Sequence, residues 1–144
     1  MTQEHKELLI KDLCSRLPYG VKVEITNTQG YHHDNVAKKG EKTIDTLKGF
    51  DSSYNCFTVY HNNPLDWDWT CNEIDIEDIK SYLFPVSSMT EEQKKEWRSL
   101  MKCDSYGILY PTIKSFDYLY KNHIDVRGLI SLGLAIDATG LNIY

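Results

Sequence analysis

The sequence has no long hydrophobic run, few arginines and no clustered glycines. Its longest apolar runs, such as Leu8-Leu9-Ile10, are far shorter than the ~20 residues of a membrane helix, so we expect no membrane-spanning segment. Only 3 of its 16 basic residues are arginine and the net charge is −5, which disfavours direct nucleic-acid binding because phosphates require cations. The scattered glycines match neither the dinucleotide-binding nor the nucleoside-triphosphate-binding motif.

Closely spaced cysteine pairs and a secretory signal are absent as well. The four cysteines (Cys14, Cys56, Cys71 and Cys103) lie far apart, so we expect them to be reduced and partly buried. Residues 1–7 are charged and lack the basic-then-apolar order of a signal peptide. We therefore expect the chain to begin here and to be cytoplasmic.

The overall composition is typical of a folded protein. With 144 residues, 41% hydrophobic and 26% charged, the chain can bury about two thirds of the surface that its unfolded form exposes. No repeat or linker divides it, so we expect one globular domain over residues 1–144.

The first half of the chain predicts one helix followed by strands. Apolar residues recur at helical spacing over residues 3–17 and then alternate with charged residues over 21–25, which predicts a strand. Residues 27–30 are typical of a turn. β-Branched and aromatic residues predict short antiparallel strands over 43–50 and 56–60.

The next segment is expected to change from strand to helix. Ile74 and Ile76 flank Asp75 in a brief strand. Ile79, Tyr82 and Leu83 then follow at helical spacing, which predicts a helical turn that Pro85 ends.

The last third predicts helices. Thr90 and Gln93 form a capping box for a helix that continues to about Lys102 and buries Trp97, Leu100 and Met101. Ser115 is expected to cap a second helix, with Phe116, Leu119, Tyr120 and His123 on one face. Asp125 is expected to cap a third helix, which ends at Gly133. Four tyrosines in the C-terminal third of the chain are expected to be half-buried packing residues: Tyr106, Tyr110, Tyr118 and Tyr120.

Grouped rather than alternating elements predict the fold class. We expect an α+β protein with an N-terminal helix, a small antiparallel sheet or partly open barrel, and C-terminal helices.

Acidic and tryptophan residues are concentrated between positions 66 and 78. No Lys or Arg interrupts this segment, which contains Asp66, Trp67, Asp68, Trp69, Glu73, Asp75, Glu77 and Asp78. In an extended segment, tryptophans two residues apart point the same way, and exposed aromatic residues with a polar rim are typical anchors of protein interfaces. The segment therefore predicts a surface that binds another protein; the alternatives are that both rings form a lid over the core, or that one ring is buried and the other exposed.

The same carboxylates suggest a particular kind of partner. An acidic surface imitates the charge of a nucleic-acid backbone and would fit the basic groove of a nucleic-acid-binding host protein. The alternative interpretation is that these carboxylates lie on loops and are simply solvated.

Catalytic and metal sites are not expected. His32-His33-Asp34 and His61, with Cys56 or Cys71, are zinc-ligand types at spacings unlike those of closed zinc sites. We predict no metal, no cofactor and no catalytic residue. A small enzyme that pairs one of these cysteines with His61 or His33 is an alternative hypothesis.

Three blocks of the sequence resemble a known group of proteins. Residues 13–21, residues 78–92, and residues 116–119 with 125–130 and 133–135 are similar to small proteins of gut Bacteroidales and of their phages and prophages, a group without an established activity. The resemblance covers about half the chain. It implies that the ends are scaffold and that the variable middle, about 27–71, determines specificity.

The resulting hypothesis is a non-enzymatic protein-binding module of phage or mobile-element origin. Its sharper form is an inhibitor of a host defence protein that acts through the acidic, tryptophan-containing segment. A virion structural or assembly component is a further alternative.

Overall fold

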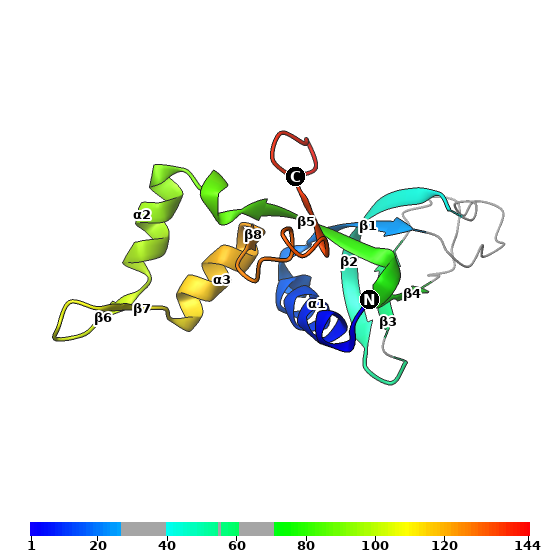
Figure 1. Cartoon of the computed structure of the whole chain (residues 1–144), viewed down its shortest axis with the longest axis horizontal. Helices are drawn as coiled ribbons and strands as arrows, with labels where there is room; N and C mark the ends of the chain where they lie inside the picture. The colour runs from blue at the N-terminus through cyan, green and yellow to red at the C-terminus, as the bar shows by residue number, and fades with distance from the viewer. Residues whose placement is uncertain (27–39, 55, 61–70) are drawn as a thin grey trace.

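The fold was described from a computed structural model, which defines residues 1–26, 40–54, 56–60 and 71–144. It is α+β, as the sequence predicts: an N-terminal helix, a mixed sheet that does not close into a barrel, and helices towards the C-terminus (Figure 1). The helices are α1 (Gln3–Arg16), α2 (Glu91–Ser99) and α3 (Ile113–Lys121), with short 3₁₀ turns η1 (Leu17–Tyr19), η2 (Ile76–Asp78) and η3 (Val86–Ser88).

Among the described residues the main sheet has seven strands. They are β1 (Lys22–Thr26), β2 (Lys42–Asp51), β3 (Cys56–Tyr60), β4 (Cys71–Asp75), β5 (Ile79–Pro85), β8 (Ile124–Asp125) and β9 (Ala135–Asp137). The order is β4-β3-β2-β1-β5-β8, and β9 also pairs with β5. All pairings from β4 to β5 are antiparallel, as expected, whereas β5 pairs in parallel with both β8 and β9. This parallel edge was not predicted.

Strand β5 corrects one prediction. Residues 79–85 form a strand of the sheet, not a helical turn. Ser81, Tyr82 and Leu83 are all buried, so both faces of the strand are covered and the alternation that marks a half-buried strand is lost. The apolar residues that remain happen to fall at helical spacing.

Helix α1 packs on the sheet to form the main core. Its apolar face recurs at helical spacing and meets residues from the strands. The fully buried members include Leu9, Leu13, Val21, Val23, Leu47, Phe57, Val59 and Leu83. The strands predicted over 21–25, 43–50 and 56–60 are confirmed as β1, β2 and β3.

The chain between β5 and β8 forms an arm, defined here as residues 89–121. It contains α2, a small hairpin of β6 (Lys102–Cys103) and β7 (Leu109–Tyr110), and α3. Figure 1 shows this arm extending away from α1 and the sheet, with the β6–β7 hairpin at its far end. A second hydrophobic cluster of Met89, Leu119 and Ile124 lies where the arm meets the sheet.

The capping box at Thr90 is confirmed, but the helix that it starts is shorter than predicted. Thr90 Oγ1 accepts from the Gln93 N–H at 3.2 Å, and the Gln93 side chain accepts from the Thr90 N–H at 2.9 Å. α2 ends at Ser99, and Lys102 already belongs to β6.

The two later caps are also corrected. Helix α3 is capped by Thr112, three residues before the predicted Ser115, because the two residues form a reciprocal capping box. Asp125 starts no helix. Its carboxylate accepts the backbone N–H groups of Leu129 and Ile130 and so stabilises a series of turns.

None of the helices in the described ranges qualifies as a membrane span, the longest being the 14 residues of α1.

Candidate binding surface

Large apolar side chains are exposed along the arm. Tyr106 is 88% and Ile113 81% exposed, values that leave almost the whole side chain in water. Four further residues of the arm are also exposed: Ile108, Leu109, Tyr110 and Phe116. Six exposed large apolar residues within one segment make the arm a candidate interaction surface.

The hairpin that carries several of these residues is fixed by Asp104. One carboxylate oxygen accepts the backbone N–H groups of Tyr106 and Ile108, at 2.9 and 2.8 Å. The other accepts the Tyr110 hydroxyl at 2.9 Å. These hydrogen bonds, above all the one from Ile108, lower the pKa of Asp104. Gly107 occupies the left-handed position of the turn, at φ 82°.

Thr112 ties the two helices of the arm together. Its hydroxyl accepts from the Ser115 N–H at 3.2 Å and donates to the Leu100 carbonyl, just after α2, at 2.7 Å. The first bond caps α3 and the second links it to the end of α2. The arm is therefore a defined structure and not a loose loop.

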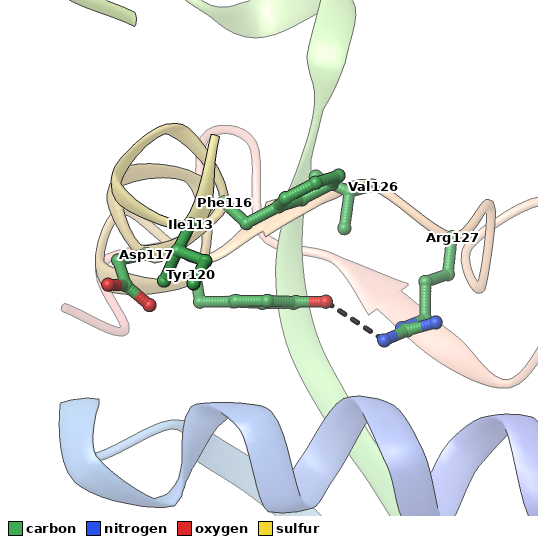
Figure 2. Close-up of a pocket in the computed structure, with 6 residues that line it drawn as sticks. All are labelled: Ile113, Phe116, Asp117, Tyr120, Val126 and Arg127. Atoms are coloured by element: carbon green, nitrogen blue, oxygen red, sulfur yellow. Dashed lines mark hydrogen bonds between the residues drawn. The ribbon is translucent and has the colours of Figure 1, made fainter. Parts of the chain in front are cut away.

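A pocket of about 440 Å³ opens beside α3, at the base of the arm. One stripe of α3 supplies most of its lining, at positions i, i+3, i+4 and i+7, and the chain after β8 supplies the rest. The lining residues are Ile113, Phe116, Asp117, Tyr120, Val126 and Arg127. Figure 2 shows the Phe116 and Tyr120 rings on two sides, with Asp117 and Arg127 at opposite ends.

Arg127 is held at the pocket by two contacts. Its Nη2 donates to the Tyr120 hydroxyl at 2.9 Å (Figure 2), and its Nε lies 3.4 Å from Asp12 Oδ1. The second contact is an ion pair without a hydrogen bond, since the buried Nε has no hydrogen-bond partner in the part of the chain that the structure describes. The side chain remains 31% exposed.

A second arginine lies beneath the pocket. Arg16 is completely buried, donates from Nε to Asp12 at 2.6 Å and from Nη2 to the Ile124 carbonyl at 2.8 Å, and lies 5.0 Å from the centre of the Tyr120 ring. Asp12 thus contacts two guanidinium groups.

Next to this ion pair, His123 stacks on Tyr144. Their ring centres are 4.1 Å apart, and the Tyr144 hydroxyl donates to the Tyr82 carbonyl and accepts from the Lys22 N–H. Burial, helped by the nearby Arg16, lowers the pKa of His123 to about 4. Burial also raises the pKa of Tyr144 to about 12.

The acidic segment predicted as the binding site is only partly described. Asp66, Trp67, Asp68 and Trp69 lie outside the described residues, as does the side chain of Glu73.

The other three acids of the segment are placed by the structure. Asp75, at the end of β4, is exposed, and Asp78 is half-buried; both have interaction partners. Glu77 forms an ion pair with Lys6 at 2.8 Å and lies 3.7 Å from the Met1 amino group. Lys6 is the main cause of the lowered pKa of Glu77.

The residues considered for metal binding or catalysis are likewise mostly outside the described part. His32, His33, Asp34 and His61 are not described, nor is the side chain of Cys71, while Cys56 is buried in β3. No cluster of three potential metal ligands occurs among the residues that the structure does describe.

The sequence reasoning missed the arm and its pocket. Phe116 was predicted on the same helix face as Leu119 and Tyr120, which are buried, yet it is 43% exposed. Tyr106 and Tyr110 were expected to be half-buried and are exposed. Tyr118 and Tyr120 do pack inward, as predicted. The missed signal is the stripe at positions 113, 116, 117 and 120, which marks one helix face but not whether that face is covered.

Comparison of the chain with protein-family models, with curated proteins and with solved structures finds no match.

Proposed function

We propose that this protein acts by binding another protein, and that the exposed apolar residues of the arm are a principal contact. The observation that carries the proposal is the exposure of Tyr106, Ile108 and Ile113 on a structure held by Asp104 and Thr112. A few residues, among which tyrosine is enriched, supply most of the binding energy at protein interfaces, and pre-ordered ones lose little entropy on binding.

We further propose that the acidic, tryptophan-containing segment is a second contact. This part rests on the sequence alone, together with the resemblance to phage and prophage proteins. In this proposal the protein is a cytoplasmic inhibitor of a host defence protein, and its carboxylates contact a basic, nucleic-acid-binding groove.

Affinity capture from a host lysate tests the contact through the arm. The variant is Tyr106→Ser with Ile108→Ser, and the matched control is Tyr54→Ser, because Tyr54 is 71% exposed in the turn between β2 and β3. We expect the arm variant to lose the partner that the wild type and the control recover. Equal recovery by all three would overturn the proposed role of the arm.

The acidic segment is tested separately. Changing Asp66, Asp68, Glu73, Asp75, Glu77 and Asp78 to amides is expected to weaken capture and to reduce its dependence on salt. Glu77→Gln alone should have the smallest effect, because Lys6 already neutralises that carboxylate. Unchanged capture at every salt concentration would remove this contact from the proposal.

A further inference from the structure

We infer that the pocket beside α3 binds the C-terminal residue of a protein partner, with an apolar side chain held between the aromatic walls and the terminal carboxylate on Arg127. The inference rests on the proposed function, which it deepens by naming the chemistry of the recognised segment.

The lining of the pocket favours a large apolar side chain. Phe116, Tyr120 and Val126 form its apolar surfaces, and a volume of about 440 Å³ is within the range of sites for small organic groups. Phe116 is 43% exposed, so in the unbound protein this wall is only half covered. Filling the pocket would remove apolar surface from water.

Arg127 supplies the charge that an incoming carboxylate requires. Its Nη2 uses one hydrogen bond on Tyr120 and its Nε faces Asp12, whereas its Nη1 has no hydrogen bond within the described residues. Asp12 is shared with Arg16, which holds it more closely, at 2.6 Å against 3.4 Å. The positive charge of Arg127 is therefore only partly neutralised by Asp12, and a guanidinium edge remains for a carboxylate.

The second charged group of the pocket fits the same ligand. Asp117 lies at the end away from Arg127 (Figure 2) and would repel a carboxylate placed there. A chain end has the matching polarity, because its carboxylate is terminal and peptide N–H groups precede it. The N–H groups would face Asp117 while the carboxylate meets Arg127, which fixes the direction of the bound chain.

Small probes test this inference without the partner. The ligands are N-acetyl-L-phenylalanine, its primary amide, and phenethylamine, titrated into the full-length protein while NMR shifts of Arg127 and of the α3 residues are followed. We expect saturable shifts with N-acetyl-L-phenylalanine and about fivefold weaker binding of the amide, the effect of one partly exposed charge-assisted hydrogen bond. Phenethylamine should bind more weakly than both.

Two variants assign the selectivity to a residue. Arg127→Gln is expected to abolish the preference for the acid over the amide, while Arg127→Lys retains part of it and Asp117→Asn, which removes a carboxylate that would repel the acid, increases it. The dispersion of the amide spectrum shows that each variant is folded. Equal binding of acid and amide by the wild type, tighter binding of phenethylamine, or no shifts at α3 would each overturn the inference.

The two proposals can fail independently. If the probes bind as expected but substitutions at Tyr106 and Ile108 leave partner capture unchanged, the proposed role of the arm is wrong and the inference about the pocket is retained. If capture depends on the arm but the probes do not discriminate, only the inference about the pocket falls.

Discussion

Asp12 and Arg16 lie one helical turn apart on α1 and form an ion pair in which both side chains are fully buried. The Arg16 Nε donates to Asp12 Oδ2 at 2.6 Å, and both side chains are 0% exposed. The same guanidinium reaches the Ile124 carbonyl of β8, 108 residues further along the chain. The pair thus links the first helix to the parallel edge of the sheet, and Arg16 lies against Tyr120, which lines the pocket.

Removing one partner of this pair should be strongly destabilising. Arg16→Met is expected to lower the free energy of unfolding by about 3–5 kcal/mol, because it leaves the Asp12 carboxylate buried with only the longer contact to Arg127. Urea denaturation followed by circular dichroism measures the change. In the double variant Asp12→Leu with Arg16→Met most of the loss should be recovered, since neither charge of the pair then remains in the core. A double variant as unstable as the single one would contradict this account.

Protonation of His123 should reduce stability in mild acid. Its pKa is about 4 in the folded protein against 6.5 for an ordinary histidine, so between these values the unfolded chain binds the proton more strongly. Stability is therefore expected to fall as pH decreases from about 6.5 to 4, by roughly 1–3 kcal/mol from this residue, with no further contribution at lower pH.

The matched variant for this prediction is His123→Asn. His123 has φ 54°, and asparagine tolerates the left-handed region better than most residues, so the backbone should be preserved. We expect the variant to lose less stability than the wild type between pH 7 and pH 4.5, as measured by chemical denaturation at each pH. Parallel curves for the two proteins would show that the histidine is not responsible.

The two capping boxes of the arm should differ in importance. Thr90→Ala removes a cap and is expected to cost about 1 kcal/mol. Thr112→Ala removes a cap and also the hydrogen bond to the Leu100 carbonyl, so its cost should be larger, at about 2 kcal/mol. Thermal unfolding of both variants gives the comparison, and Thr112→Ser, which keeps the hydroxyl, is the control. Equal losses at the two positions would argue against the tie between α2 and α3.

Gly49 should tolerate no side chain while Thr58 faces it. An added Cβ would lie 2.6 Å from Thr58 Oγ1 on the neighbouring strand, next to a shift in the β2–β3 register. Gly49→Ala is expected to destabilise the protein by about 1–3 kcal/mol. Adding Thr58→Ala should restore much of this loss, and a double-mutant cycle of unfolding free energies measures the coupling. Additive effects would mean that the clash is relieved elsewhere.

Local patterns in the sequence were sufficient for much of the fold. Helix α1, strands β1 to β3 and the Thr90 capping box follow from the spacing of apolar residues and from one pair of polar side chains. These elements have one buried face, so their periodicity survives in the sequence. Strand β5 is covered on both faces, and its pattern therefore predicts the wrong element.

The candidate binding surface was much less accessible to sequence reasoning. A stripe such as Phe116 and Tyr120 has the same spacing whether a neighbouring element covers it or water does. The surroundings of this face of α3 depend on the long-range pairing of β8 with β5, because that pairing places Arg127 beside α3. The parallel pairing joins Phe84 to Ile124, and no local pattern encodes a contact across that separation.

The bond from Thr112 to the Leu100 carbonyl has a kinetic consequence. The two helices of the arm are joined by this bond, and its root is packed around Leu119 and Ile124, so the arm is expected to keep its shape if a partner binds. Docking would then require little rearrangement, and such encounters commonly proceed at about 10⁵–10⁷ M⁻¹s⁻¹. Differences in affinity among variants of the arm should accordingly be found in the lifetime of the complex rather than in the rate at which it forms.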